Sequence, residues 1–556
     1  MPIGVEDFKK LRDKNYYFVD KTYFIQQFLD NHGDVTLITR PRRFGKTLTL
    51  SMMDWFFSIQ KQKESKGLFD ALAISRAGEE YMGQQGQHPV IFFSLKDIKN
   101  IAWKSWAEML DYIRVSFSFS FAEYQDVIEN CTLAGEKRLL VRVLSQEASV
   151  NELSLSLVSL MRAMQSYYGK KVILLLDEYD VPIQQAWEGG YYEPCIGFMR
   201  QFLSPALKTN DSLDFAILTG VLRVAKESIF SGLNNFKLCS ILDGRYSDVF
   251  GFTAEETENL LAKLHLSDKM LEVQSWYDGY RIGGQEMYNP WSVLNYIDND
   301  CMPRPYWVRT SENGILKSLL ENPNPLQITA LQDLVEKKTI EVTLNESIVY
   351  PDIQADASAL FTLLLTTGYL TVVKVMPELD DRYLLRIPNL EIRKLYHTEI
   401  LDYIVQGAHK NVFDNLFIFL LKGDAERFSW QLKDILQKFV STWDTANKES
   451  FYHGFMLGMS VLFLNQDYVV ESNRESGYGR FDLAIFPKDA TKSGVIMEFK
   501  AAVREDELEN KAQDALQQIA DKKYDTEFTK RGIRKVWKYG IAFYGKQVCV
   551  MRGAVQ

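Results

Sequence analysis

Residues 35–50 read Val35-Thr36-Leu37-Ile38-Thr39-Arg40-Pro41-Arg42-Arg43-Phe44-Gly45-Lys46-Thr47-Leu48-Thr49-Leu50, and they decide the fold of the first half of the chain. A β-branched stretch runs directly into Gly-Lys-Thr and then into an apolar stretch that can form a helix, which is the context of a Walker A phosphate-binding loop. Such a loop points successive backbone N–H groups at phosphates and adds a lysine and a Mg²⁺-binding hydroxyl. The sequence therefore predicts an ATP site whose binding residues are Arg42, Arg43, Phe44, Gly45, Lys46 and Thr47.

One position departs from the usual loop. The pattern G-x-x-x-x-G-K-[ST] would place its first glycine at position 40, and this chain has Arg40. Two alternatives stay open for this departure: a weakened turn, or an unusual entry into the loop.

A second motif supports the first. Residues 170–180 read Lys-Lys-Val-Ile-Leu-Leu-Leu-Asp-Glu-Tyr-Asp, an apolar strand that ends in acids. We expect Asp177 to hold Mg²⁺ and Glu178 to polarise the attacking water. Thr219 ends another apolar run, where its hydroxyl would reach the γ-phosphate. Arg223 would stabilise transition-state charge in cis or toward a neighbouring copy in a homo-oligomer, and a plain salt-bridge role is the alternative.

Composition sets the broad class of the protein. The 556 residues are 46% hydrophobic and 25% charged, which is typical of a globular protein of about two to four domains. The longest apolar stretch, 454–464, is shorter than the roughly 17–25 residues of a membrane span, and the start of the chain lacks a signal-peptide pattern. Five dispersed cysteines favour a reducing compartment. We therefore expect a cytoplasmic protein without a membrane segment.

The order of apolar runs predicts an α/β fold. Four continuous runs, 35–39, 90–95, 172–176 and 215–219, indicate strands buried on both faces, as in a parallel sheet covered by helices. We assign residues 1–265 to this P-loop domain. Residues 266–444 read as a helical, winged-helix-like and linker region, and 445–556 as a last domain.

The last domain carries a set of residues typical of nucleases. Asp482 lies in Gly-Arg-Phe-Asp-Leu-Ala-Ile-Phe (479–486), and Glu498 and Lys500 end Gly-Val-Ile-Met-Glu-Phe-Lys (494–500). The strand period of two places Glu498 and Lys500 on one face. Two acids that hold Mg²⁺ beside a lysine that orients water suit phosphodiester hydrolysis. Chance occurrence of E-x-K is the alternative.

Other residues near this set have two possible roles. Gln518, on a predicted helix 508–520, would face the site or be a solvated glutamine, and Glu475 would be a third acid or a turn residue. His453 fits helix packing better than a role as a base. Although the net charge is −9, residues 521–540 carry +4, which predicts either a nucleic-acid contact or a solvated face. The seven cations are Lys522, Lys523, Lys530, Arg531, Arg534, Lys535 and Lys538.

Several segments resemble a known bacterial family. The loop 40–47, Tyr-Phe-Val-Asp-Lys-Thr (17–22), Leu-Asp-Glu-Tyr-Asp (176–180), Leu-Thr-Gly-Val (218–221) and Ser-Ile-Phe-Ser-Gly-Leu-Asn-Asn (228–235) are similar to the AAA-ATPase-like family. The resemblance covers about the first 235 residues and implies an ATPase fold related to the AAA and STAND groups. It also implies that Lys21 lies near the nucleotide.

The C-terminal segments resemble the PD-(D/E)xK nuclease superfamily. They include Tyr-His (452–453), residues 472–482, Glu-Phe-Lys (498–500), Gln-Gln-Ile (517–519) and Lys-Tyr (523–524), although Phe481 stands where the family name has proline. The expected fold class is thus α/β, with a P-loop NTPase domain, a middle region and a C-terminal restriction-endonuclease-like domain. The resemblance implies an ATP- and Mg²⁺-dependent nuclease acting on nucleic acid, with DNA favoured, in defence or mobile-element biology. The alternative is a nucleotide-switched scaffold whose nuclease-like domain only binds nucleic acid.

Overall fold

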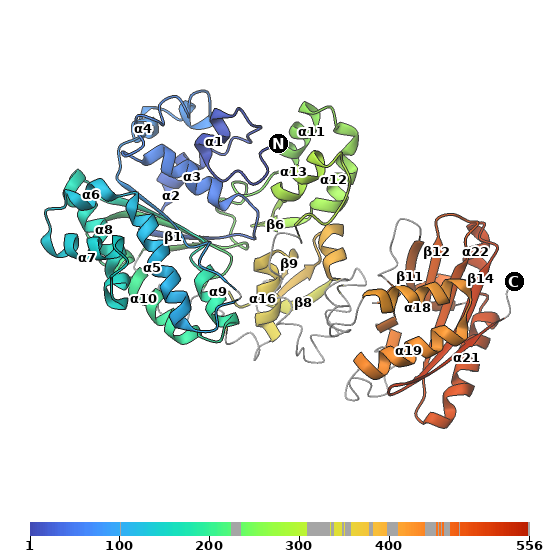
Figure 1. The fold of residues 1–556 in the computed structure, drawn as a ribbon. Coiled ribbons are helices and arrows are strands. Elements are labelled where there is room, and N and C mark those ends of the chain that lie inside the picture. Colours follow the sequence, from blue (N-terminus) through green and yellow to red (C-terminus); the bar gives the residue numbers. More distant parts are fainter. Residues whose placement is uncertain are drawn as a thin grey trace. The chain divides into compact units, whose positions relative to one another are not determined.

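A computed structural model of the chain forms two compact units, Met1–Ile315 with Thr339–Ile392, and Leu316–Lys338 with Arg393–Gln556 (Figure 1). The structure describes residues 1–100, 102–223, 235–307, 334, 339–346, 350, 357–376, 382–396, 410–439, 452–453, 455–456, 459–460, 468–476 and 479–553. Within these ranges, none of the helices has the length and apolarity that crossing a bilayer requires.

A five-stranded parallel sheet is the centre of the first unit. Its order is β2-β3-β4-β1-β5. The strands are β1 (Val35–Thr39), β2 (Val90–Ser94), β3 (Val172–Asp177), β4 (Leu213–Gly220) and β5 (Phe236–Cys239). All residues of β1 and β3 are buried, because these strands are covered on both faces. The predicted parallel sheet is confirmed, and β5 is an edge strand that the sequence pattern did not predict.

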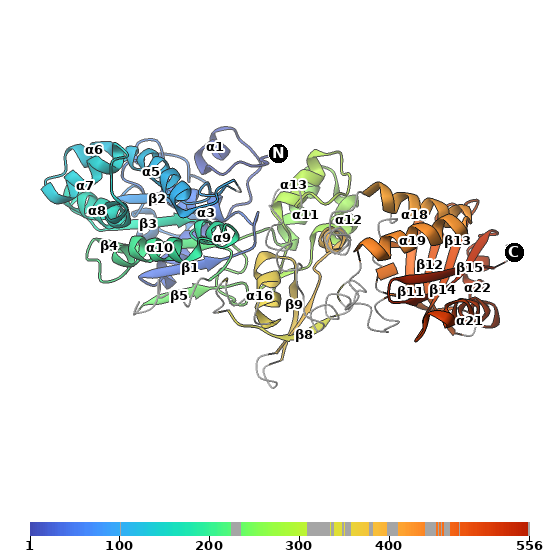
Figure 2. The same ribbon diagram turned by 60° about the horizontal axis from the view of Figure 1, so that its bottom comes forward.

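Helices surround this sheet. They are α1 (Phe8–Asp13), α2 (Tyr23–Asn31), α3 (Lys46–Phe57), η1 (Ala73–Arg76), α4 (Glu79–Met82), α9 (Val181–Glu188) and α10 (Tyr192–Leu207). The long segment between β2 and β3 forms α5 (Trp106–Ala122), α6 (Gln125–Glu129), α7 (Ala134–Leu144) and α8 (Val150–Tyr168), which lie together beside the sheet in both views (Figures 1 and 2). The segment between β2 and β3 is therefore a helical group.

The middle region of the chain belongs largely to the same unit. It contains α11 (Ala254–Lys263), η2 (Ser267–Lys269), α12 (Met270–Tyr277), the hairpin β6 (Tyr280–Ile282) and β7 (Gln285–Met287), and α13 (Pro290–Asp298). An antiparallel sheet of order β8-β10-β9 follows, with β8 (Ile340–Thr343), α16 (Ala357–Thr367), β9 (Thr371–Met376) and β10 (Arg382–Arg386). Gly368 ends α16 with a φ of +93°, and β9 follows.

A buried carboxylate ties this middle region together. Glu391, in the helix of residues 390–396, is fully buried and accepts hydrogen bonds from the Ser292 hydroxyl and the Trp307 backbone N–H, both at 2.8 Å. Burial raises the pKa of Glu391 from 4.5 to about 7, and its hydrogen bonds with Trp307, Ser292 and the Tyr306 backbone oppose that rise. The folded chain therefore binds this proton more tightly than the unfolded chain does.

This raised pKa predicts a pH dependence of stability. Between about pH 4.5 and 7 the folded state holds the Glu391 proton and the unfolded state does not, so the free energy of unfolding falls as pH rises. The loss is about 3 kcal/mol, because each pKa unit is worth about 1.4 kcal/mol. We expect Glu391→Gln to remove this fall, since the amide oxygen can accept from the backbone donors and the amide NH₂ can donate to Ser292. Urea unfolding of the full chain at about pH 5 and about pH 8 measures it. Parallel pH profiles in wild type and variant would contradict the prediction.

The second unit is a mixed sheet with helices on both faces. Its order is β11-β12-β13-β14-β15, and the pair β13–β14 is parallel while the others are antiparallel. The strands are β11 (Tyr468–Ser476), β12 (Gly479–Pro487), β13 (Gly494–Ala501), β14 (Val536–Tyr544) and β15 (Gln547–Arg552). The helices are α18 (Lys410–Lys422), α19 (Ala425–Phe439), η5 (Glu505–Glu507), α21 (Leu508–Asp521) and α22 (Thr526–Lys530).

Apolar side chains fix these layers. Helices α18 and α19 cover one face of the sheet through a cluster that includes Phe417, Phe428 and Tyr539, and α21 covers the other face (Figure 2). A Cβ on Gly540 would lie 2.2 Å from the Ala512 carbonyl oxygen, so only glycine lets α21 approach β14 so closely.

The three expected segments are distributed over these two units. Residues 266–307 and 339–392 group with the N-terminal unit, whereas α18 and α19 group with the C-terminal one. The boundaries at 265 and 444 remain a prediction, since residues 440–451 lie outside the described ranges. The cationic stretch 521–540 lies inside the last domain and forms α22 and the start of β14.

Candidate nucleotide and nuclease sites

The phosphate loop lies between β1 and α3 with an irregular backbone. Arg43 and Gly45 have φ values of 67° and 86°, and α3 begins at Lys46. Alternating right- and left-handed residues before a helix start make a concave set of N–H groups that favours anions. Because β1, β3 and β4 are parallel, their carboxyl ends bring the loop, Asp177 and Thr219 to the same edge of the sheet.

Lys46 is buried beneath this loop. Its ammonium donates to the carbonyl oxygens of Arg40 at 3.1 Å and Pro41 at 3.0 Å. Burial lowers the pKa of Lys46, while the charges of Glu178 and Asp177 act in the opposite direction. A phosphate would offer this ammonium an ionised partner in place of two neutral carbonyls.

Thr47, Asp177 and Thr219 form one hydrogen-bonded group. The Asp177 carboxylate accepts from the Thr47 hydroxyl at 2.8 Å and from the Thr219 hydroxyl at 2.7 Å. Asp177 is fully buried, and both burial and the charge of Glu178 raise its pKa. A hydroxyl and a buried carboxylate at contact distance are oxygen ligands that fit Mg²⁺, whose charge would favour the ionised form of Asp177.

Glu178 has a left-handed backbone, with a φ of 51°. The Glu178 backbone N–H donates to the Thr219 hydroxyl at 3.4 Å, and Glu178 lines the pocket at the loop. A non-glycine residue in this conformation is strained, and such strain persists where the surroundings hold it, often at functional sites. The turn directs Glu178 away from the buried position of Asp177.

A pocket of about 480 Å³ opens over the loop. The loop residues Arg42–Thr47 and Glu178 line it, together with apolar residues that include Tyr17, Phe252, Trp291 and Leu294. A lining that combines polar and aromatic groups suits a ligand with phosphates and a planar ring.

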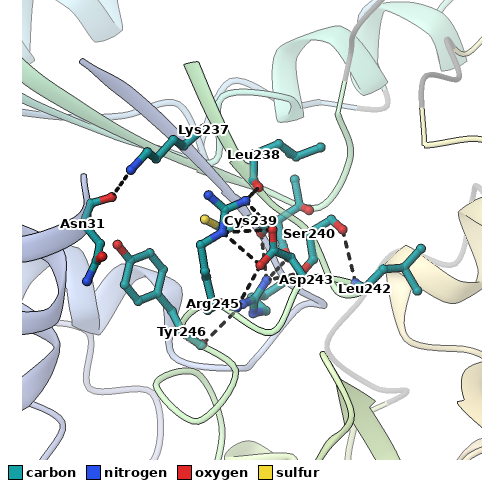
Figure 3. Close-up of polar contacts among 11 residues, drawn as sticks. Asn31, Lys237, Leu238, Cys239, Ser240, Leu242, Asp243, Arg245 and Tyr246 are labelled. Carbon is teal, nitrogen blue, oxygen red and sulfur yellow. Dashed lines mark hydrogen bonds and ion pairs between the residues drawn. The ribbon is translucent and has the colours of Figure 1, made fainter. Parts of the chain in front are cut away.

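Arg40 explains the missing glycine. Its fully buried guanidinium donates to five backbone carbonyl oxygens, those of Thr39, Cys239, Ser240, Arg245 and Tyr246, at 2.8–3.3 Å. Burial lowers its pKa to about 10. Figure 3 shows the turn from Cys239 to Tyr246 that supplies most of these carbonyls, closed by the Arg245–Asp243 ion pair. Of the two alternatives, the structure has the unusual entry: Arg40 ties the start of the loop to the segment after β5.

Asp180 is a site residue whose part the sequence did not indicate. Its Oδ2 accepts from the backbone N–H groups of Val221 and Leu222, both at 2.8 Å, and thereby shapes the turn after β4. A Cβ on Gly220 would lie 2.6 Å from Asp180 Oδ1, so the close approach requires glycine there. Asp180 is the third residue after the strand-ending Asp177, but its partners lie 41 and 42 residues away in the sequence.

Arg223 and Lys21 are engaged by other residues of the chain. The Arg223 guanidinium lies over the Phe236 ring of β5, at 5.9 Å, and Arg223 is outside the pocket lining. Lys21 does line the pocket, but its ammonium is paired with Glu256 at 2.6 Å and donates to the Asp248 carbonyl. Within the described residues, then, a role for Arg223 toward its own pocket lacks geometric support, and a role toward a second copy stays a prediction.

The C-terminal sheet brings the expected nuclease residues together. Glu498 is buried on β13, and the Lys500 ammonium lies 3.7 Å from its carboxylate, on the face that the period of two predicts. The Asp482 carboxylate accepts from the Phe499 N–H at 2.7 Å, and the Asp482 N–H donates to Glu498 at 3.3 Å. Asp482 lies inside β12 and not at a strand end, because β12 runs on to Pro487.

Gln518 and Tyr524 complete this cluster. The Gln518 amide, on α21, donates to Glu498 and also contacts the Tyr524 hydroxyl at 3.3 Å. The solvated alternative for Gln518 is thereby excluded. Tyr524 was noted only for its resemblance, and the structure buries it beside Gly479. Among the described residues no group of three His, Cys, Asp or Glu side chains has metal-binding geometry, so any metal here would rest on Asp482 and Glu498 with backbone or water oxygens. The side chain of Glu475 lies outside the described ones.

His453 packs as expected and also makes a specific contact. Its Nε2 lies 2.9 Å from the Asp482 carbonyl oxygen and 3.0 Å from the Ser472 hydroxyl, and its ring is edge-on to Phe499. A protonated Nε2 donates to the carbonyl and so fixes the β12 backbone at Asp482.

The cationic stretch is partly engaged within the domain. Arg531 pairs with Glu527 and Glu471, and Lys538 pairs with Asp525. These ion pairs make Arg531 and Lys538 structural residues. Lys522 lies beside Gly479 near the Tyr524 hydroxyl, close to the acidic cluster.

Family comparisons match the same two parts of the chain. Residues 2–230 match the AAA-ATPase-like family, described as a predicted AAA-ATPase, and residues 447–553 match the PD-(D/E)XK nuclease superfamily. The protein therefore joins a domain of the AAA-ATPase-like class to a domain of the PD-(D/E)XK nuclease superfamily, and both resemblances are confirmed.

A similar protein aligns with this chain over nearly its whole length. A protein of Azotobacter chroococcum mcd 1, described as an uncharacterized protein in the vnfD 5′ region, is 27% identical over 543 residues, which cover 96% of this chain and 94% of that protein. The aligned region spans most of both domains.

Proposed function

We propose that this protein binds and hydrolyses ATP and that its C-terminal domain is a Mg²⁺-dependent nuclease acting on nucleic acid, with DNA favoured. The observation that carries the proposal is the group of Thr47, Asp177 and Thr219 directly beside the phosphate loop and Lys46. We further propose a cytoplasmic protein that acts in defence or mobile-element biology.

In the ATPase site the chain's own residues have separate roles. The loop amides and Lys46 bind phosphates, Thr47 and Asp177 hold Mg²⁺, and Thr219 orients Asp177. Glu178, whose left-handed backbone and place in the pocket lining support this role, would accept a proton from water. Mg²⁺ would neutralise phosphate charge during transfer.

In the nuclease site Asp482 and Glu498 would hold the metal. Gln518 orients the Glu498 carboxylate, and the Phe499 N–H orients that of Asp482. Lys500, which lies beside Glu498, would position water and stabilise negative charge at the phosphate. Lys522, Lys523, Arg534 and Lys535 would contact the nucleic-acid backbone.

The alternative is a scaffold that binds nucleic acid without cutting it. The internal bonding of Glu498 to Gln518, Lys500 and the Asp482 N–H favours this alternative, because a carboxylate so engaged has fewer lone pairs left for a metal.

Incubation of plasmid DNA and of RNA with the full chain separates the two functions. Mg²⁺ or Mn²⁺ is supplied with and without ATP, and Lys46→Ala and Asp482→Asn variants are run beside the wild type. We expect metal-dependent cleavage that Asp482→Asn lacks. Retention of nucleic acid without cleavage under every metal and nucleotide condition supports the scaffold.

A further inference from the structure

The phosphate loop is held from outside by the middle region of the same unit. Phe44 packs edge-on against Tyr280 with ring centroids 5.1 Å apart, and the Arg43 guanidinium lies 4.2 Å from the Trp291 ring. A Cβ on Gly368 would lie 3.0 Å from the Pro41 side chain. Pro41, Arg43 and Phe44, which lie between Arg40 and Gly45, are thus contact residues for this region.

Trp307 makes a hydrogen bond to this loop. The residue is buried, and its indole Nε1–H donates to the carbonyl oxygen of Arg42 at 3.3 Å. Its ring packs edge-on against Tyr369, with centroids 5.1 Å apart. Its backbone N–H donates to the buried Glu391 carboxylate, which also accepts from Ser292. The indole is therefore fixed from two sides before it reaches the loop.

The hydrogen bond from Trp307 also affects the orientation of the next N–H group in the loop, that of Arg43. The carbonyl of Arg42 and the N–H of Arg43 belong to the same planar trans peptide, so they point in opposite directions. Trp307 lies outside the pocket lining, whereas Arg43 is part of it. A hydrogen bond that holds the Arg42 carbonyl toward Trp307 therefore holds the Arg43 N–H away from Trp307, in a loop whose residues line the pocket. Arg43 also has the left-handed φ that an anion-binding turn needs and that a non-glycine residue keeps only when its surroundings hold it.

We propose that Trp307, supported by Glu391, is a positioning residue that orients the Arg42–Arg43 peptide of the phosphate loop for binding the phosphates of a nucleotide. The inference rests on the proposed ATP site for its ligand. The affinity of the phosphate loop for a nucleotide would then depend on the middle region, whose residues contact the loop.

Trp307→Phe tests the hydrogen bond alone. Phenylalanine keeps the aromatic packing on Tyr369 and removes the N–H. We expect the affinity for ADP, measured by calorimetry, to fall about five- to tenfold, which corresponds to one hydrogen bond. The matched control is Trp537→Phe in the other unit, where the indole donates to the Leu421 carbonyl at 2.9 Å. This control removes the same kind of bond and should leave ADP affinity unchanged.

Glu391 offers a second pair of variants. Glu391→Gln keeps acceptors for the Trp307 N–H and should retain ADP affinity, whereas Glu391→Ala removes the support and should weaken ADP binding as Trp307→Phe does. Because both changes act through one contact, the double variant Trp307→Phe/Glu391→Ala should be no weaker than the poorer single variant by more than about twofold. Fully additive losses would overturn the role of Glu391.

Hydrogen exchange in the nucleotide-free protein separates this inference from the proposed function. The amides of residues 40–47 should exchange faster in Trp307→Phe than in the wild type, and at the wild-type rate in Trp537→Phe. Unchanged exchange in Trp307→Phe, or an ADP affinity within twofold of the wild type, overturns the positioning role. If the wild type binds no ADP but exchange at residues 40–47 is still faster in Trp307→Phe, the positioning role of Trp307 is supported and the proposed ATP site is contradicted.

Discussion

Lys46→Ala is expected to abolish detectable ATP binding. The ammonium is buried, its two partners are neutral carbonyls of the loop, and nearby carboxylates surround it. Removing it would leave Glu178 and Asp177 facing the phosphates without the cation that offsets their charge. Charge-assisted hydrogen bonds are worth about 1.5–3 kcal/mol each, so the loss of two such bonds to phosphate weakens affinity by about a hundredfold or more.

Calorimetry with ATP and Mg²⁺ measures this effect. Lys170→Ala is the matched control, because Lys170 is an exposed lysine that precedes β3 at the opposite end of the sheet from the loop. Equal ATP affinity in Lys46→Ala and wild type would remove the phosphate loop from the proposal.

Glu178→Gln should separate binding from hydrolysis. The amide has nearly the same shape but cannot accept the proton of the attacking water, so turnover should fall by about 10²–10⁴-fold while ATP affinity stays near that of the wild type. Glu193→Gln, which changes an exposed carboxylate on α10, is the control. Turnover of Glu178→Gln within a few-fold of the wild type would assign the base elsewhere.

The sequence predicted the parts of these sites that depend on local pattern. The strands β3 and β4 carry Asp177 and Thr219 at their carboxyl ends, and β1 leads into the loop that ends at Lys46. In a parallel sheet such ends meet, so Lys46, Asp177 and Thr219 could be placed together without any knowledge of contacts. Glu498 and Lys500 followed from the strand period in the same way.

Contacts between distant segments were beyond the reach of these patterns. Arg40 binds carbonyl oxygens about 200 residues away, and Trp307 binds one 265 residues away, and both use backbone acceptors that every residue type provides. The sequence shows that position 40 lacks the usual glycine, but it does not show that the Arg40 side chain binds the turn after β5. Strand β14 did not follow from the sequence pattern, because its apolar run begins at Val536 inside the cationic stretch 521–540.

Asp482→Asn is expected to abolish cleavage of nucleic acid by the C-terminal domain. Asparagine keeps an oxygen that can accept from the Phe499 N–H, so the β12–β13 backbone should be retained, but it removes one of the two charges that would hold the metal. Partners that only orient a metal ligand are worth about 10–100-fold, so loss of a ligand charge itself should cost at least about a hundredfold in cleavage rate. Lys500→Ala should lower the cleavage rate through lost charge stabilisation at the phosphate, with the metal-binding acids still present.

Matched controls and a binding measurement make this prediction sharp. Asp489→Asn and Lys488→Ala change exposed residues of the turn between the same two strands and should cleave as the wild type does. ATP hydrolysis should be unchanged in all four variants, because the ATPase residues lie in the other unit. Each backbone contact that Lys522 or Arg534 makes should add about 0.7–0.9 to the slope of log affinity against log salt, so their alanine variants should flatten that slope. Cleavage by Asp482→Asn at the wild-type rate would show that Asp482 and Glu498 do not form the metal centre, because an intact backbone and a missing charge would then have no consequence for catalysis.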